Sequence, residues 1–256
     1  MPGTPAPPYV SQLETPHGAI LCDEEVADRI DIAWFDVEHW RRQGGADATP
    51  AGRGAAAFVE TPAGPMVLRR YLRGGLAARL SRDRYLFTGA DRTRGFAEFR
   101  MLAKLRRAGL RVPQPLAAMY RRHGLFYAAA ILVARIEGVT RLCELLDRAD
   151  HRLFAHVGRA IGDLHRQRVW HADLNADNIL LDEGGDVWLV DFDRARVRDQ
   201  PGDGAWALGN LARLRRSMFK FEAPRRMADF EGAWAELLRG HAVVLRGTDR
   251  PLGKPA

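Results

Sequence analysis

Three oxygen-bearing side chains lie close together in the sequence, within residues 171–193. Asp173 falls in a predicted loop, Asn178 begins a short apolar strand, and Asp191 directly follows a second one. The polar turn at 182–185 joins the strands, so an antiparallel hairpin would bring Asn178 and Asp191 side by side. Hard oxygen ligands at this spacing suit Mg²⁺ that carries substrate phosphates. Asp173 could face the same point as a base or an orienting carboxylate.

The order of these residues is itself informative. His-x-Asp-Leu, three further residues, Asn and a later Asp-Phe match the catalytic loop and metal-binding signature of the protein-kinase-like fold. A hairpin with polar turn residues at its ends could explain Asn178 or Asp191 alone, but hardly the whole ordered set. The pattern therefore predicts phosphoryl transfer.

The elements that must position this site change character near Gly138. Upstream, alternating apolar residues and glycine or proline turns predict mainly strands, whereas apolar residues downstream recur at helical spacing. We predict an α+β, protein-kinase-like fold of two lobes: an N-terminal antiparallel sheet lobe, residues 1–137, and a helical C-terminal lobe, residues 138–256. The expected elements are a flexible tail at 1–14, a hairpin around 16–18, helices at 27–42, 94–108, 142–146 and 153–164, and strands at 57–60, 66–71, 116–120 and 125–136.

The predicted N-terminal lobe departs from the usual kinase pattern where phosphates would bind. Gly52 and Gly54 belong to a glycine-rich turn that lacks a third glycine, although small residues there would let backbone N–H groups approach phosphates. The strand at 66–71 contains no lysine, so Arg69 or Arg70 must hold the α- and β-phosphates. Alternation sends the two side chains to opposite faces, and we favour Arg69 slightly, although the sequence does not decide.

Two further nucleotide-binding features are expected in this lobe. Glu98, on the helix at 94–108, is a candidate partner for the phosphate-holding cation, although a surface charge pair explains it equally well. The adenine would lie against residues 131–136, with the backbone of Arg135 and Ile136 bonding its edge. The apolar side chains of that strand are core residues by default.

Longer strings resemble one family, the Kdo kinases (3-deoxy-D-manno-oct-2-ulosonic acid kinases) of lipopolysaccharide core assembly. The resemblance covers residues 15–220 approximately, and it is carried by "YLFTG" at 85–89, "HADLNADNILLD" at 171–182, "VWLVDFDRAR" at 187–196 and "NLARLRRS" at 210–217. The central motif marks the broad kinase-like fold, and the flanking strings mark the family. The chain is on these grounds expected to be a phosphotransferase with an alcohol acceptor.

The resemblance implies a reaction and a role for each motif residue. The γ-phosphoryl group of ATP would pass to a hydroxyl of Kdo, expected at the 4-position, on a lipid A precursor. Asp173 would be the catalytic residue, Asn178 and Asp191 the Mg²⁺ ligands, and His171 a brace for the loop. The neighbouring Asn175 and Asp177 are at least as well explained by a solvated loop face. The alternatives are a kinase of another small sugar or an aminoglycoside, or a nucleotide-binding scaffold without phosphotransfer.

The composition bears on partners and location. Lys and Arg number 39 against 32 Asp and Glu, a net charge of +7, which favours polyanionic partners. Only three of the basic residues are Lys. The basic clusters at 69–84 and 213–220 could contact an anionic glycolipid and a membrane surface or could simply be solvated; no nucleic acid is expected, since no recognition motif is present. Two cysteines without metal-ligand spacing indicate a reducing compartment. We expect a peripheral protein at the cytoplasmic face of the inner membrane.

Overall fold

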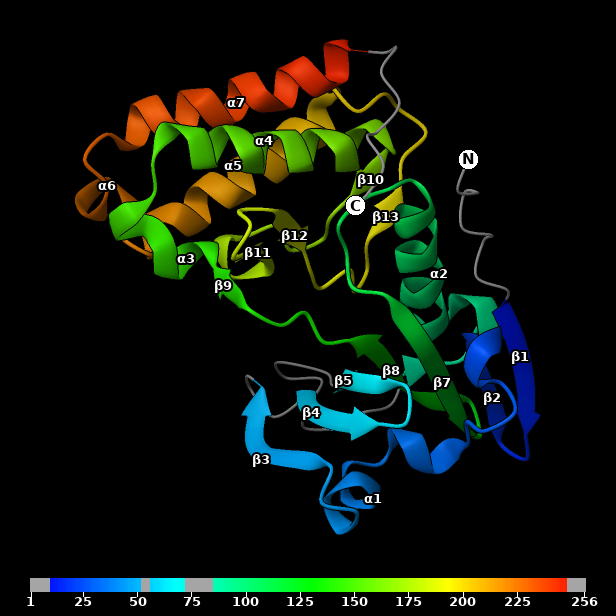
Figure 1. The fold of residues 1–256 in the computed structure, drawn as a ribbon. Coiled ribbons are helices and arrows are strands. Elements are labelled where there is room, and N and C mark those ends of the chain that lie inside the picture. Colours follow the sequence, from blue (N-terminus) through cyan, green and yellow to red (C-terminus); the bar gives the residue numbers. More distant parts are fainter. Residues whose placement is uncertain (1–9, 52–55, 72–84, 248–256) are drawn as a thin grey trace, which may run out of the picture. The chain divides into compact units, whose positions relative to one another are not determined.

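The structure is a computed structural model, and it describes residues 10–51, 56–71 and 85–247 (Figure 1). The chain forms two compact units. The first comprises residues 1–103 and 114–135, and the second comprises residues 104–113 and 136–256. The antiparallel sheet lies in the first unit and most of the helical residues lie in the second, which confirms the predicted α+β organisation.

The first unit is built on one antiparallel sheet of eight strands among its described residues. The strands run in the order β1-β2-β7-β8-β5-β4-β3, and β6 pairs with β8. The predicted hairpin of the 116–120 and 125–136 strands is confirmed, because β7 and β8 pair along their length. The strands are β1 Val10–Thr15, β2 Gly18–Asp23, β3 Ala46–Ala51, β4 Ala56–Thr61, β5 Gly64–Arg70, β6 Tyr85–Leu86, β7 Pro115–His123 and β8 Phe126–Ala134.

Two predictions about the N-terminal region are wrong. The tail expected at residues 1–14 is not a tail over 10–14, because these residues form β1 and pair with β2 across the predicted turn at 16–18. The single helix expected at 27–42 is broken into 3₁₀ turns at Glu24–Val26 and Ile32–Phe35 and the helix α1, Val37–Arg42. Asp31 and Asp36 explain the breaks, since each has extended backbone and its side chain caps the turn that follows.

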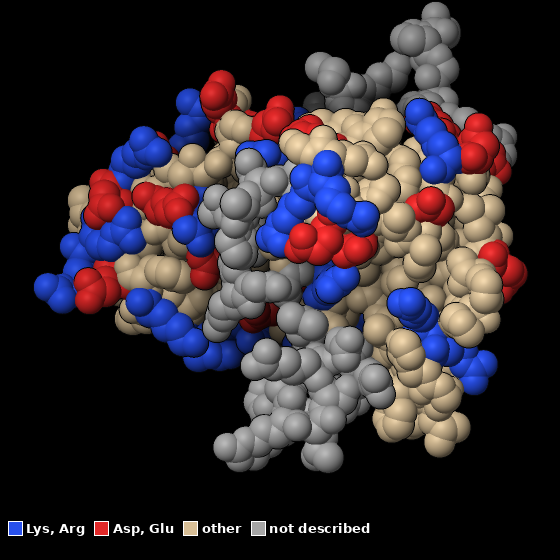
Figure 2. Space-filling view, turned by 90° about the horizontal axis from the view of Figure 1, so that it is seen from below, with Lys and Arg blue, Asp and Glu red and all other residues tan. Residues whose placement is uncertain are grey.

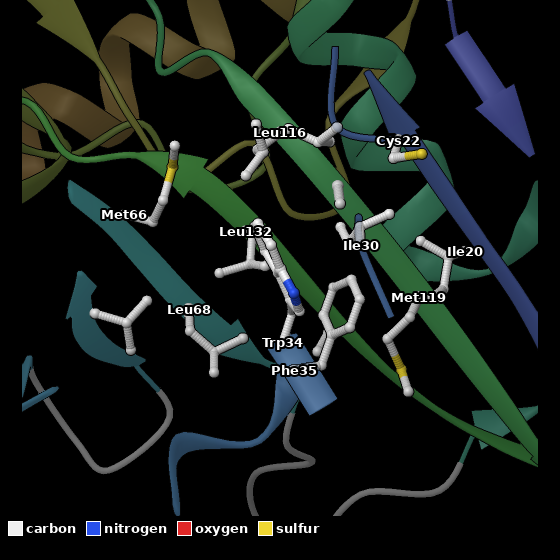
Figure 3. Close-up of a cluster of buried hydrophobic side chains, with 14 of the residues drawn as sticks. Ile20, Cys22, Ile30, Trp34, Phe35, Met66, Leu68, Leu116, Met119 and Leu132 are labelled. Carbon is white, nitrogen blue, oxygen red and sulfur yellow. The ribbon is translucent and has the colours of Figure 1, made fainter. Parts of the chain in front are cut away.

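These short helical turns supply large side chains to the core of the first unit. Trp34 and Phe35 lie against Leu68 and Leu132 of the central strands, and Met119 lies beside them (Figure 3). The Trp40 indole donates a hydrogen bond to the Trp34 carbonyl at 2.8 Å, which satisfies the one polar atom of this buried ring. The sheet face is therefore covered by apolar side chains from the short helical turns between the caps Asp31 and Asp36 and beyond.

The predicted helix at 94–108 is confirmed as α2, Arg94–Arg107, preceded by a 3₁₀ turn at Ala90–Arg92. The last turn of α2 and the residues after it, 104–113, belong to the second unit. Arg111 accounts for this, because its carbonyl accepts a hydrogen bond from the Leu189 N–H at 3.0 Å and its guanidinium pairs with Asp186 at 2.6 Å. The prediction instead placed 104–113 in the N-terminal lobe.

The second unit combines helices with a small three-stranded sheet and a two-stranded one. The predicted hairpin after the catalytic motif is confirmed as β11 and β12, and β9 pairs with β11 on the other side. The helices are α3 Leu142–Leu145, α4 His151–Arg166, α5 Ala205–Lys220, α6 Ala223–Arg226 and α7 Phe230–Arg246, with 3₁₀ turns at Leu146–Arg148 and Ala176–Asn178; the strands are β9 Val139–Arg141, β10 Val169–Trp170, β11 Ile179–Asp182, β12 Val187–Leu189 and β13 Arg196–Val197.

Helices α4 and α7 pack side by side at glycines (Figure 1). A Cβ at Gly158 would lie 2.0 Å from the Leu237 carbonyl oxygen, and one at Gly240 would lie 2.3 Å from that of Ala155. Side chains there would push the two backbones apart. The apolar residues of α4 recur at Phe154, Val157, Ile161 and Leu164 on the buried side, as its sequence rhythm predicts.

The surface carries both charge signs. On the face shown in Figure 2, the visible Lys and Arg side chains are interleaved with Asp and Glu. Within the described part of the chain, no helix has the length and apolar character needed to cross a membrane.

Candidate active site

The hairpin β11–β12 places Asn178 and Asp191 at the same end. The Val190 N–H donates to the Asn178 carbonyl at 3.1 Å, so Asp191 follows immediately beyond the last bond that joins the strands. Asp191 has a φ of +64°, a left-handed conformation that costs a non-glycine residue about 1 kcal/mol or more. Such strain persists only where the surrounding structure fixes the residue, and the next residue, Phe192, is buried.

His171 is the centre of the loop that carries Asp173. Its Nδ1 accepts the Asp173 N–H at 3.1 Å and its Nε2 donates to the Val190 carbonyl at 3.0 Å. Complete burial lowers the pKa of His171, so the ring is neutral and can be a donor at one nitrogen and an acceptor at the other. The predicted brace is thus visible as a bond from the loop to the hairpin. The ring also meets Phe192 edge-on, with centroids 4.9 Å apart.

Asn178 joins the loop to the candidate metal site. Its Nδ2 donates to the Asp173 carbonyl at 2.9 Å, which leaves the amide oxygen without a partner among the described residues. This amide oxygen and the carboxylate of Asp191, which lies at the same end of the hairpin, are the kinds of hard donor that fit Mg²⁺ when phosphates and water supply the remaining ligands. Across the described residues, no cluster of three or more His, Cys, Asp or Glu could hold a metal without such help.

The Asp173 carboxylate faces outward from this rigid loop. It is about half exposed, and Arg213 of α5 contacts its Oδ1 at 3.1 Å. A carboxylate that is fixed at its backbone and accessible at its oxygens can meet an incoming hydroxyl group and receive its proton.

Helix α5 holds the loop from behind through residues that sequence reasoning missed. The side chain of Asn210 makes a paired contact with His171, accepting from its N–H at 3.0 Å and donating to its carbonyl at 2.7 Å. Seven residues further along the helix, the Ser217 hydroxyl accepts the Ala176 N–H at 3.0 Å. The sequence contains one signal for these two residues. Asn210 and Ser217 are polar, and their spacing of seven residues puts them on the same, otherwise apolar, face of the helix.

Two further histidines extend this buried network. His165 contacts Asn210 Oδ1 through Nε2 at 3.3 Å and His241 Nε2 through Nδ1 at 2.8 Å. Burial, together with the neighbouring His241, lowers the pKa of His165 to about 3. The chain of contacts runs from α7 through α4 and α5 to the loop.

Asn175 and Asp177 serve the local structure of the loop. The Asn175 side chain caps the 3₁₀ turn at 176–178, accepting the N–H groups of Asp177 and Asn178 at 2.9 and 3.1 Å. Asp177 accepts from the Cys143 thiol at 3.1 Å and from Arg141 at 3.2 Å. Both side chains are therefore engaged within the protein.

In the first unit, the structure brings Arg69 and Glu98 together. Arg69 Nη2 pairs with Glu98 Oε1, and the Tyr71 hydroxyl donates to Glu98 Oε2 at 2.6 Å. Burial, with the charge of Glu98, raises the pKa of Tyr71. Arg70 instead points to the exposed side, 3.7 Å from Asp36. The alternation argument thus separates the two arginines as expected, and the cation–carboxylate pair forms on Arg69.

The remaining predicted nucleotide contacts are those of the glycine-rich turn and of the backbone at Arg135 and Ile136. Gly52 and Gly54 lie outside the described residues. The Arg135 N–H bonds to the Pro65 carbonyl at 3.0 Å and closes the end of the β5–β8 pairing. The adenine contacts assigned to the backbone of Arg135 and Ile136 stay predictions.

A cavity of about 310 Å³ opens elsewhere in the second unit, beside α4, β12 and the 104–113 segment. Its lining includes Arg111, Arg159 and Asp163 but none of the loop or hairpin ligand residues described above. The cavity is therefore separate from the candidate catalytic residues.

Phosphoryl transfer depends on positioning and charge neutralisation. The site is suited to both, because the Asp173 carboxylate faces outward from a loop that His171 braces. Asn178 ties this loop to the hairpin that ends at Asp191. The fold and this site define a phosphotransferase of the protein-kinase-like class, with an alcohol group as acceptor.

The chain belongs to the lipopolysaccharide kinase (Kdo/WaaP) family, whose sequence model matches residues 37–241. It is 46% identical over 242 residues to a 3-deoxy-D-manno-octulosonic acid kinase of Stenotrophomonas maltophilia strain K279a, which covers 90% of this chain and 92% of the relative. A protein of the same name from Xanthomonas axonopodis pv. citri is 46% identical over 232 residues, with coverages of 89% and 91%. The granulovirus kinase PK-1 of Cydia pomonella is a structural neighbour at a TM-score of 0.42 and 10% identity, over 62% of this chain and 55% of that one.

Proposed function

We propose that this protein transfers the γ-phosphoryl group of ATP to a hydroxyl, the 4-OH, of Kdo on a lipid A precursor. The names of its relatives support Kdo as the acceptor. The observation that carries the proposal is the contact between Asn178 Nδ2 and the Asp173 carbonyl at 2.9 Å, because it fixes the catalytic carboxylate relative to the donors that would face the phosphates.

The proposed reaction forms one bond to phosphorus, breaks another and transfers one proton. The acceptor oxygen bonds to the γ-phosphorus of ATP while the bond from that phosphorus to the β,γ-bridging oxygen breaks, and ADP leaves. The acceptor proton passes to Asp173 and then to solvent. Asn178 and Asp191 would hold Mg²⁺, which supplies charge neutralisation on the phosphates. In the first unit, Arg69 would hold the α- and β-phosphates in place of the usual lysine, itself positioned by Glu98.

We further propose that the protein acts as a peripheral protein at the cytoplasmic face of the inner membrane. The end of the β7–β8 hairpin supports this, because the large apolar side chains of Leu86, Leu125 and Phe126 are exposed there beside Arg121 and Arg122. Apolar tips next to cations suit an anionic lipid surface. The protein should sediment with phosphatidylglycerol vesicles and the Leu125→Ser, Phe126→Ser double variant should not; equal sedimentation of both would contradict this attachment.

The reaction is tested with labelled ATP and a choice of acceptors. Kdo-lipid A precursor, soluble sugars and an aminoglycoside are offered side by side, and the position of the phosphate is read by mass spectrometry and NMR of the product. Asp173→Asn should lower turnover of the Kdo acceptor by about 10²- to 10⁴-fold. Asp177→Asn is the matched control, since it makes the same change four residues away on a side chain engaged with Cys143 and Arg141.

Each alternative has its own outcome. Phosphorylation of a soluble sugar or an aminoglycoside, with none of the Kdo acceptor, would identify a different small-molecule kinase. Stabilisation by ATP with Mg²⁺ but no product from any acceptor would identify a nucleotide-binding scaffold. Turnover that Asp173→Asn leaves unchanged would contradict the role of this carboxylate.

A further inference from the structure

Helix α5 carries a row of cations that begins at the catalytic carboxylate. Arg213, Arg216 and Lys220 are spaced three and four residues apart, so their side chains share one exposed face of the helix. Arg213 Nη1 lies 3.1 Å from Asp173 Oδ1, and the other two follow along the same face. Beside Arg213, at Gly209, an added Cβ would meet nothing within 4 Å, so this stretch of the helix surface is open among the described residues.

The neighbouring Arg215 shows what an arginine with a structural role looks like on this helix. It points to the other side, where it pairs with Glu231 at 2.7 Å and lies over the rings of Phe219 and Trp234 at 5.7 and 5.9 Å. Arg216 and Lys220, in contrast, have no carboxylate within 4.0 Å among the described residues. Like charges at this helical spacing repel one another, and a bound anion would relieve the repulsion.

The contact between Arg213 and Asp173 leaves Arg213 ready to bind a second anion. Both side chains are about half exposed, and ion pairs in such surroundings are weak and easily exchanged. One guanidinium nitrogen contacts Asp173, and the other donors have no partner among the described residues. A guanidinium can bind a carboxylate through two parallel hydrogen bonds.

The proposed acceptor carries a carboxylate, whose negative charge must be neutralised near Asp173, and Arg213 is the cation at that place. A sugar acid must bring its hydroxyl to the Asp173 carboxylate, and its own carboxylate then comes near the same negative charge. Arg213 lies where it can neutralise both. Positions three or four residues further along a helix are about 5–6 Å away, a spacing that suits successive anionic groups of one extended ligand.

We propose that the α5 row, Arg213 with Arg216 and Lys220, is the binding site for the acidic groups of the acceptor. Arg213 binds the carboxylate of the sugar acid next to the reacting hydroxyl. Arg216 and Lys220 bind anionic groups further along the acceptor. This assignment rests on the proposed function and specifies how the enzyme selects an acidic sugar over a neutral one.

The test compares two acceptors that differ in one group. Kdo-lipid acceptor and the same molecule with its carboxylate converted to a carboxamide are assayed with wild-type protein and with Arg213→Gln. Wild-type protein should prefer the acid by about ten- to a hundred-fold in kcat/KM, and Arg213→Gln should bring that ratio close to one, because only the acid can use the guanidinium. Arg213→Lys should restore part of the preference.

Further variants separate this site from a general effect of charge. Arg216→Gln with Lys220→Gln should raise the KM for the lipid acceptor several-fold without changing the KM for ATP. Arg225→Gln, which removes the same charge from a side chain 82% exposed on α6, should leave both constants unchanged. An equal rise in Arg225→Gln would indicate non-specific attraction and overturn the inference.

The outcomes distinguish this inference from the proposed function. If wild-type protein phosphorylates the Kdo acceptor and Arg213→Gln keeps the full preference for the acid, the α5 row is not the acceptor site although the function stands. If wild-type protein phosphorylates no Kdo acceptor, the proposed function fails and the inference fails with it.

Discussion

At the scale of single residues, the most unusual feature is an arginine where most kinase-like enzymes have a lysine. Arg69 shares the carboxylate of Glu98 with the Tyr71 hydroxyl, and the Glu98 side chain is only 2% exposed. A buried carboxylate needs its partners, because desolvation without them is costly. The planar guanidinium can pair with Glu98 and still offer donors toward phosphates, which one ammonium group does less readily. The substitution is therefore compatible with nucleotide binding.

Arg69 and Arg70 form a matched pair for mutation. Arg69→Ala should lower the free energy of unfolding by about 2–4 kcal/mol, because it removes the guanidinium that pairs with the buried Glu98 carboxylate. Arg70→Ala should lower it by less than about 0.5 kcal/mol, because that side chain is exposed and loosely paired with Asp36. Urea denaturation of the three proteins measures both effects. Similar losses in the two variants would show that Glu98 does not depend on Arg69.

The sequence predicted those site residues whose spacing along the chain is short. Asp173, Asn178 and Asp191 belong to one loop and one hairpin, so their relative placement follows from local pairing. Asn210 was missed because it reaches the loop from a helix 39 residues after His171, and only tertiary packing shows which helix face meets the loop. His165 is close to His171 in the sequence, but it was missed because it acts through Asn210. The bond from the Arg135 N–H to the Pro65 carbonyl was not predicted, because backbone pairing cannot be read from side-chain type.

At the scale of elements, the periodicity of apolar residues predicts the strands and the long helices, whereas capping residues decide where short helical segments begin and end. The 27–42 region has a roughly helical rhythm, yet Asp31 and Asp36 accept hydrogen bonds from the next turn and end each helical segment early. Side-chain caps of this kind compete with helix propagation. The strand β1 was mistaken for a tail because its neighbours in sequence are rich in proline, while its partner β2 supplies the order.

The close packing of α4 on α7 at Gly158 can be tested by mutation. Gly158→Ala should destabilise the protein by about 2–3 kcal/mol, because the new Cβ would lie 2.0 Å from the Leu237 carbonyl oxygen and α7 would have to move. Gly209→Ala in α5 is the control, since a Cβ there meets nothing within 4 Å and alanine should stabilise the helix by up to about 1 kcal/mol. Thermal denaturation should therefore shift in opposite directions. A shift of the same sign in both variants would contradict close packing of α4 on α7.

At the scale of the whole molecule, the basic residues that produce the positive net charge have different structural roles. Many arginines pair with carboxylates on the surface, as Arg226 does with Asp147 and Arg215 with Glu231. Arg69 serves the buried site of the first unit, and the α5 row faces outward from the second. The composition could indicate a polyanionic partner, but it could not separate these groups, because only the fold decides which arginine finds a carboxylate.

The buried histidines of the second unit make global stability depend on pH. Burial lowers the pKa values of His165, His171 and His241, and that of His165 falls to about 3. As pH falls below about 6.5, the unfolded chain binds protons at these rings before the folded chain does, so the free energy of unfolding decreases. At pH 5.5, His165 alone should cost about 1.4 kcal/mol relative to neutral pH.

Urea denaturation at pH 7.5 and 5.5 measures this loss. The wild-type protein should be less stable at pH 5.5, and His165→Gln should show a smaller difference between the two pH values, because it removes one of the titrating rings while an amide can still contact Asn210. Stability that stays constant or rises on acidification would show that these rings bind protons in the folded protein at least as readily as in the unfolded chain. That result would contradict the neutral His171, with one donor and one acceptor nitrogen, on which the geometry of the catalytic loop depends.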